Sequence, residues 1–177
     1  MNELEIVAIF REIVGKLQAN GEMECIPTIQ YLFGSSQYIK DTLDVYSKSK
    51  LHSERKFPLV ALFTPVLEER GEVDYFSKAK VSLIIACSSL HDWSNEEREI
   101  RSFRNILRPI YRRLLEVLKD DEHFDWGYNE AIRHTYSENY DYGRYGAYTE
   151  GGEAVSEPID AINIRSLELK INYPNCR

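Results

Sequence analysis

The stretch Lys80-Val81-Ser82-Leu83-Ile84-Ile85-Ala86-Cys87 and the long segment after it, as far as Leu118, decide the fold of this chain. The run from Val81 to Cys87 consists mainly of branched and other apolar residues, and it is bounded by lysines before it and by Ser88-Ser89 after it. It is too short to span a membrane, which takes about 20 apolar residues in a helix. The pattern is typical of a buried β-strand.

After a polar bend, the sequence predicts a long amphipathic helix. Ser94-Asn95-Glu96-Glu97 fits the capping-box pattern at its start and places acids in the first turn. Pro109 removes one helical hydrogen bond and disfavours the helical conformation of the residue before it. We therefore expect either a kink near Arg108 or two consecutive helical pieces. The residues expected on the buried face are Ile100, Phe103, Leu107, Ile110, Leu114 and Leu118.

Further strands are predicted on both sides of this unit. Phe57 to Phe63 has a strand pattern that Pro65 is expected to end, and a charged turn at 68–72 leads into the strand from Val73 to Cys87, which should pair antiparallel with the first. In the last strand, Ile159 to Ile171, the apolar alternation changes phase by one residue near Arg165-Ser166. Such a change predicts a β-bulge.

The remaining segments complete an α+β domain. The sequence predicts an amphipathic helix over residues 2–17, a short strand over 28–33, and a surface helix from Ser35 or Ser36 to Ser49. The chain is therefore expected to be a single domain in which a long helix and an N-terminal helix pack on a mainly antiparallel sheet. Its parts are an N-terminal helical part (1–50), a strand-strand-helix core (56–119), a tyrosine-rich loop or hairpin (120–158) and a closing strand (159–173).

The composition limits the class of protein. With 177 residues, 43% of them hydrophobic, the chain can build a core without metals or disulfides. The net charge of -7 argues against a general nucleic-acid binder. Cys25, Cys87 and Cys176 have neither the spacing of a zinc site nor the even number of a disulfide framework, and no signal-peptide pattern is present. We expect a soluble intracellular protein.

Few residues have the spacing expected of a catalytic or metal-binding site. Cys87 and His91 do not complete a tetrahedral metal site as a pair, and Cys87 lies in the apolar strand pattern, so a buried structural thiol is expected. A hydrolytic cluster would have to use residues near the tyrosine-rich segment, and these have no fixed spacing: Asp121, Glu122, His123, Asp125, Glu130 and His134. The sequence predicts no catalytic residue, no metal site and no cofactor.

Two features point to contacts with other subunits. The long helix carries an arginine flank that consists of Arg101, Arg104, Arg108 and Arg112. This flank is either a solvated surface paired with Glu97 and Glu116, or a subunit contact in which the guanidinium groups meet carboxylates of a neighbouring copy. Direct DNA binding is a weaker third interpretation. The tyrosine-rich segment is either a flexible excursion or an adhesive arm. The candidate interface residues are Arg101, Arg104, Arg108, Arg112, Tyr136, Tyr140, Tyr142, Tyr145 and Tyr148.

The order of these elements resembles a known family. The residues that carry the resemblance are the strands at 57–63 and 80–86, the helical stretch Leu107-Arg108-Pro109-Ile110-Tyr111, and the closing strand with Asp160-Ala161-Ile162 and Leu169-Lys170-Ile171. Together they are similar to tail-terminator or neck (head-tail connector) proteins of tailed bacteriophages. The extension to Lys50 and the tyrosine-rich segment depart from that pattern.

The resemblance implies a virion protein without an active site. Such a subunit forms a homo-oligomeric ring in the tail or neck, is assembled in the host cytoplasm, and contacts neighbouring neck, portal-side or tail-tube proteins, while DNA passes through the lumen as cargo and no membrane is involved. An acidic surface suits a channel through which DNA slides. Two alternatives stay open: a small intracellular hydrolase or nuclease using the histidines and acids of the 120–140 region, and a host protein-binding module.

Overall fold

The computed structural model describes residues 6–18, 23, 25–48, 56–71, 76–128, 131–145 and 157–172. They form an α+β domain whose five-stranded sheet has the order β1-β2-β3-β5-β4. β1 pairs with β2 in parallel, and every other neighbouring pair is antiparallel. The prediction of a mainly antiparallel α+β fold is confirmed. The strands are β1 (Gln30–Gly34), β2 (Leu59–Arg70), β3 (Phe76–Ser88), β4 (Thr135–Tyr145) and β5 (Glu157–Asn172).

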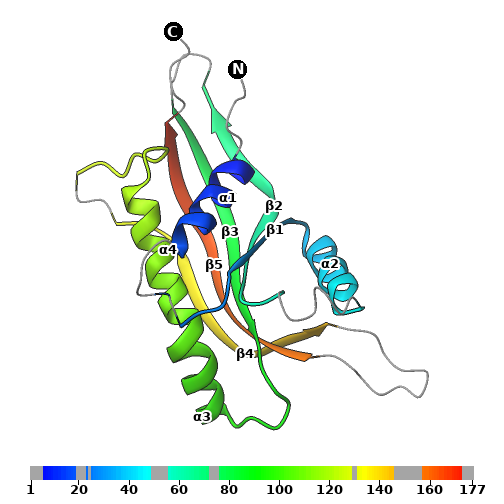
Figure 1. The fold of residues 1–177 in the computed structure, drawn as a ribbon. Helices are drawn as coiled ribbons and strands as arrows, with labels where there is room; N and C mark the ends of the chain where they lie inside the picture. Colours follow the sequence, from blue (N-terminus) through cyan, green and yellow to red (C-terminus); the bar gives the residue numbers. More distant parts are fainter. Residues whose placement is uncertain are drawn as a thin grey trace.

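Helices cover both faces of this sheet (Figure 1). Alternate residues of β2 belong to two separate apolar clusters: Val60 and Leu62 pack with α1 and the long helical run, whereas Leu59 and Ala61 pack with α2. This alternation follows from the period of two in a strand, and it makes both faces apolar at the centre of the sheet. The helices are α1 (Ile6–Leu17), α2 (Ser36–Lys48) and a 26-residue run composed of α3 (Asn95–Arg98), the π-helical segment η3 (Glu99–Leu107) and α4 (Arg108–Asp120).

The helical run begins as predicted and then departs from an α-helix. Ser94 and Glu97 form the capping box, with the Glu97 amide 3.2 Å from Ser94 Oγ and the Ser94 amide 2.9 Å from Glu97 Oε2. The run passes through Pro109, and its hydrogen bonding changes from π to α type at Arg108. Proline is tolerated there because it occupies the first turn of α4.

The π-helical segment also changes which residues face the core. Ile100 was expected on the buried face but is 50% exposed, whereas Ser102 and Phe103 are buried. A π turn holds more residues than an α turn, so the buried position two turns before Leu107 moves from Ile100 to Arg98, which is 5% exposed. The other five residues predicted for this face are buried.

Strand β2 is longer than its sequence suggests. The prediction that Pro65 ends this strand is wrong, and residues 68–70, expected in a turn, are its last residues. The pairing register between β2 and β3 shifts between Phe63 and Leu67, and β1 pairs only with residues 59–63. Pro65 therefore lies where the ladder is interrupted and where no neighbour requires its missing N–H group.

The predicted bulge in the last strand is confirmed. β5 pairs with β3 through Leu167 opposite Val81 and Ile164 opposite Leu83, so Arg165 and Ser166 face the single residue Ser82. Ser166 has a φ of 52°, in the left-handed region. The bulge keeps Ile164 and Leu167 on the buried face despite their odd spacing.

The tyrosine-rich segment forms one strand of a hairpin. Of the two predicted alternatives, the described residues bear out the hairpin, because β4 pairs antiparallel with β5 from Thr135 to Tyr145. Residues 146–156 lie outside the described residues. Within the described ranges, no helix is long and apolar enough to cross a membrane.

Candidate functional site

Arg108 joins the long helical run to strand β4. Its Nε and Nη2 atoms donate to both carboxylate oxygens of Glu138 at 2.7 and 2.9 Å. Its Nη1 and Nη2 atoms also donate to Glu99 at 2.6 and 2.8 Å. A planar guanidinium suits two such forked contacts, which a lysine could not reproduce. Of the predicted interface arginines, Arg108 is thus occupied within its own subunit.

These contacts shift the ionisation of all three groups. The hydrogen bonds from Arg108 lower the pKa of Glu99 and Glu138 below the usual carboxyl range, with a smaller contribution from the Tyr140 hydroxyl at Glu99. The two carboxylates raise the pKa of Arg108 in turn. All three side chains therefore stay charged at neutral pH.

Two predicted tyrosines pack against the same helical run. The Tyr140 ring lies 4.3 Å from the Phe103 ring, and its hydroxyl donates to Glu99 at 2.9 Å. The Tyr136 ring lies 4.7 Å from the Tyr111 ring, and its hydroxyl donates to Glu138. Burial is the main cause that raises the pKa of Tyr140 to about 12. These rings are integrated in the subunit, although Tyr136 and Tyr140 remain 37% and 36% exposed.

The other predicted tyrosines are less constrained. Tyr142 is 45% exposed on β4. The backbone of Tyr145 ends β4, but its side chain and the whole of Tyr148 lie outside the described residues. Their predicted role in a subunit contact stays a prediction.

The remaining arginines of the flank differ from one another. Arg101 lies 3.5 Å from Glu97 and 4.9 Å from the Trp93 ring centroid, so the expected pairing with Glu97 is present. Glu116 pairs with Arg113 at 3.0 Å rather than with a member of the flank. Arg104 and Arg112 are exposed and form no hydrogen bond or ion pair with another residue of the described ranges. They are the two guanidinium groups of the flank that remain available.

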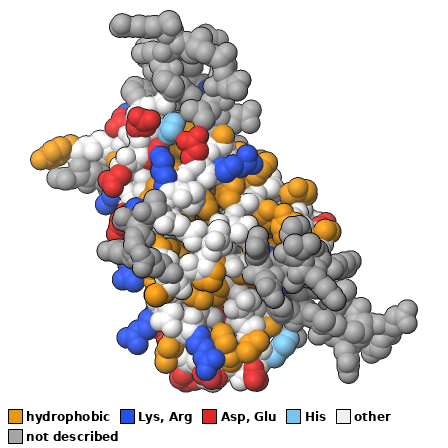
Figure 2. Space-filling view, viewed as in Figure 1, with side chains coloured by type: hydrophobic (Ala, Val, Ile, Leu, Met, Phe, Trp, Pro, Cys, Tyr) orange, Lys and Arg blue, Asp and Glu red, His pale blue; other side chains and the backbone are white. Residues whose placement is uncertain are grey.

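These two arginines border a hollow that the helical run and strand β4 form together. It has a volume of about 390 Å³ and is lined by Arg104, Arg108, Tyr111, Arg112 and Tyr136. Figure 2 shows Lys and Arg side chains spaced along this edge of the molecule, over the middle of the helical run. Arginine and tyrosine are among the residue types enriched in the centres of protein interfaces. We call this surface the arginine-tyrosine hollow.

A buried ionic network holds the start of the helical run against the sheet. Arg98 Nη1 donates to Asp160 Oδ1 at 2.7 Å and to Ser89 Oγ at 2.8 Å, and Ser102 Oγ donates to Asp160 Oδ2 at 2.6 Å. The backbone amide of Asp141 donates to Asp160 as well, at 2.9 Å. Sequence reasoning missed this network. The available signal was one acid, Asp160, within the apolar pattern of the closing strand.

The described residues considered for hydrolysis do not gather at one place, and Glu130 lies outside the described residues. His123 bonds through Nδ1 to Asp121 at 2.6 Å, whereas His134 Nε2 lies 2.7 Å from the Tyr111 hydroxyl. The backbone beside each histidine bonds to β5 four residues apart, at Asn172 and Glu168, which corresponds to about 13 Å along a strand. The two histidines therefore do not form one cluster.

The expected structural thiol is confirmed. Cys87 is 2% exposed in β3, and burial raises its pKa to about 12. Among the described residues, no group of His, Cys, Asp and Glu side chains is arranged to hold a metal ion. His91 is exposed on the bend after β3.

The sequence was also compared with known proteins. Neither a protein-family model nor a curated protein matches it.

Proposed function

We propose that this chain is a structural subunit of a tailed bacteriophage, a tail terminator or neck protein, which assembles with copies of itself into a closed ring around the DNA channel. The proposal rests on the element order, which resembles that family, and on a surface suited to protein contacts. Partners in the virion would be neighbouring neck, portal-side or tail-tube proteins. DNA would pass through the lumen without being bound tightly.

The observation that carries the proposal is the arginine-tyrosine hollow. Arg104 and Arg112 are exposed and form no ion pair or hydrogen bond with another described residue, and they line the hollow together with Tyr111 and Tyr136. Inside one subunit these arginines contribute little to folding stability, because an exposed charge is hydrated to a similar extent in the folded and the unfolded chain. Opposite a partner with matching carboxylates they gain charge-assisted, forked hydrogen bonds.

The charge balance supports the same function. The chain carries 29 acidic and 22 basic residues. A ring of such subunits presents DNA with a surplus of negative charge, which limits adhesion of the phosphates to the channel wall. A subunit that held DNA through phosphate contacts would need basic residues concentrated on the surface that faces the DNA.

Attachment to phage structures tests the proposal. The purified full-length chain is incubated separately with tail tubes and with DNA-filled heads of its phage, each purified from a mutant that lacks this protein, and bound protein is detected by gold labelling in electron microscopy. Labelling confined to one end of the tails or to the neck is the expected result. Labelling spread evenly over both particles, or absent from both, would overturn the proposal.

A further inference from the structure

We infer that the arginine-tyrosine hollow of one subunit receives the carboxylates of Glu12 and Glu122 from a second copy of this chain. The inference rests on the proposed function and names the partner of the surface described above. It assigns two different surfaces of the same subunit to one contact.

The hollow presents two separate positive charges to a partner. Arg108 is fixed between Glu99 and Glu138, so the charges that remain are those of Arg104 and Arg112. They lie eight positions apart on the helical run, which corresponds to about 12 Å along the helix axis at the rise of an α-helix. Tyr111 and Tyr136 line the space between them and supply rigid apolar area.

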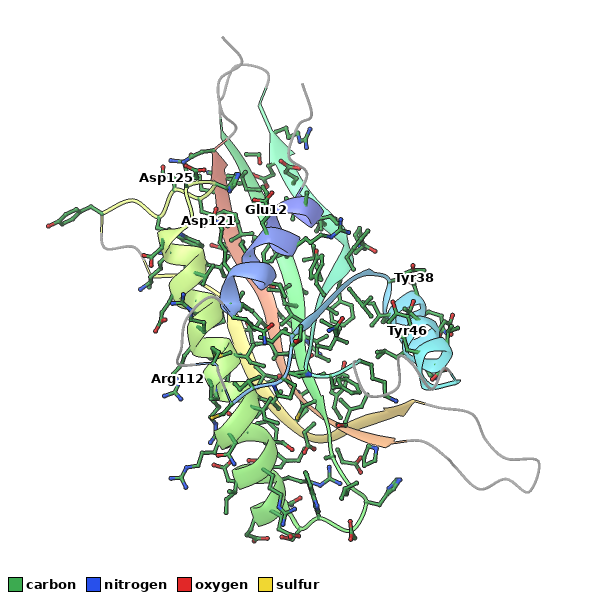
Figure 3. All side chains as sticks on the ribbon, in the orientation of Figure 1. Glu12, Tyr38, Tyr46, Arg112, Asp121 and Asp125 are labelled. Atoms are coloured by element: carbon green, nitrogen blue, oxygen red, sulfur yellow. The ribbon has the colours of Figure 1, made fainter. Side chains whose placement is uncertain are left out.

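A complementary pair of acids lies at the end of the same helical run. Glu12 is exposed on α1, and Glu122 is exposed in the turn after α4. Both act on the charge of Lys16, so they lie on the same part of the surface. The Lys16 ammonium group itself bonds to Asp121 at 2.6 Å, which leaves Glu12 and Glu122 without a hydrogen-bonded cation among the described residues. Figure 3 shows Glu12 beside Asp121 at the upper end, and Arg112 part-way down the helical run.

The separation of the two surfaces favours a head-to-tail contact. Arg104 and Arg112 lie in the middle part of the run, whereas Glu122 lies beyond its C-terminal end. A contact between two different surfaces leaves the acidic pair free on one subunit and the hollow free on the other, and repetition of the contact closes a ring when the rotation permits. This is the type of contact that a ring-forming subunit requires.

A second copy fits the hollow better than DNA does. The carboxylates of Glu99 and Glu138 lie directly beside Arg108 at the hollow. Duplex DNA carries one negative charge per about 1.7 Å of its axis, so these acids and the remainder of the acidic surface would repel it. Two carboxylates on one partner instead match the two available guanidinium groups.

Charge reversal provides the test. The full-length chain is prepared as wild type, as Arg104→Glu with Arg112→Glu, as Glu12→Arg with Glu122→Arg, and with all four substitutions together. A control carries Lys40→Glu with Lys78→Glu, which changes the net charge as the arginine pair does but at other exposed positions. Assembly is measured by sedimentation velocity over a concentration series, and folding by circular dichroism.

Each double reversal should raise the apparent dissociation constant of assembly by at least about tenfold, because like charges then face each other. The quadruple variant restores opposite charges and should return the constant to within about threefold of the wild-type value. The control should assemble as the wild type does. All variants should remain folded, because none of the four residues is bonded to a described neighbour.

Other results would overturn the inference in distinguishable ways. A wild-type chain that stays monomeric contradicts the proposed function and this contact with it. If the wild type assembles and the arginine reversal has no effect, the hollow is not the interface, although a ring is still formed. If the arginine reversal weakens assembly but the quadruple variant does not recover, the partner acids are not Glu12 and Glu122. Loss of duplex-DNA binding on arginine reversal, with unchanged assembly, would assign the hollow to nucleic acid.

Discussion

Arg98 Nη1 lies 2.7 Å from Asp160 Oδ1, and the two side chains are only 6% and 0% exposed. The pair connects the first helical turn after the capping box with the closing strand, 62 positions further along the chain. Ser89, Ser102 and the amide of Asp141 also bond to the pair, and Arg98 Nη2 donates to the Leu90 carbonyl at 3.0 Å. A buried pair of this kind is costly to break, because removal of one partner leaves the other charge without compensation.

Asp160→Asn should therefore lower the free energy of unfolding by about 3 kcal/mol, which urea denaturation followed by circular dichroism can measure. A double-mutant cycle with Arg98→Met measures the coupling free energy between the two side chains. The double variant should be destabilised by less than the sum of the two single variants. Additive losses would show that the two charges do not act as a pair.

Arg108→Lys should weaken the attachment of β4 to the helical run. Lysine keeps the charge but loses the forked hydrogen bonds to Glu99 and Glu138. The Arg108 side chain is 34% exposed. Because solvent screens a pair at this exposure, we expect a loss of only about 1 kcal/mol in the free energy of unfolding.

Arg104→Lys is the matched control for this measurement, since Arg104 lies one turn earlier on the same flank and has no bonded partner in the described part of the chain. Its unfolding free energy should be unchanged within error. Equal losses in the two variants would contradict the special role of Arg108.

The decline of the unfolding free energy at low pH should depend on Asp121. Burial raises the pKa of this carboxyl, but hydrogen bonds from Lys16 and His123 outweigh burial and hold the pKa below its ordinary value of 3.8. A carboxyl with a lowered pKa in the folded state contributes stability that is present above the ordinary value and is lost as pH falls through the folded-state value. Asp121→Asn should flatten the decline of unfolding free energy between about pH 4 and about pH 2.

Lys16→Met should reduce the same acid dependence, because the hydrogen bond from Lys16 is the largest cause that lowers the Asp121 pKa. If the unfolding free energy of both variants declines at low pH as steeply as that of the wild type, this pH dependence does not come from Asp121.

Cys87 should resist alkylation in the folded protein. Its thiol is buried, and a pKa of about 12 leaves almost no thiolate at about pH 8. A variant with Cys25→Ser and Cys176→Ser leaves Cys87 as the single thiol. Iodoacetamide should modify it only in denaturant, as peptide mass spectrometry can establish; rapid modification under native conditions would show that the strand opens readily.

Local patterns in the sequence predicted much of this fold. The phase change near Arg165-Ser166 located the bulge, because a strand with one buried face must insert a residue to keep its apolar side chains inward. The spacing from Ser94 to Glu97 located the start of the helical run, because the capping box is a contact within four residues. Both signals come from residues that are close together in the chain, so they are recognisable in a single sequence.

Features that depend on distant pairing were not predictable in this way. Asp160 stands out as an acid within an apolar strand pattern, but its partner Arg98 is brought to it only by the fold. The π-helical segment has no established local signature, so the α-helical wheel misplaced Ile100. The arginine flank was recognised as a unit, but its division into the bonded Arg108 and the available Arg104 and Arg112 required the position of Glu138 on β4.

Native mass spectrometry of the purified full-length chain measures whether copies of this subunit close into a ring. We expect one dominant species that contains a fixed number of 20.7 kDa subunits, more than two, and whose mass does not change on further concentration. A monomer at every concentration, a dimer as the final species, or a ladder of open oligomers without a closed end point would contradict it.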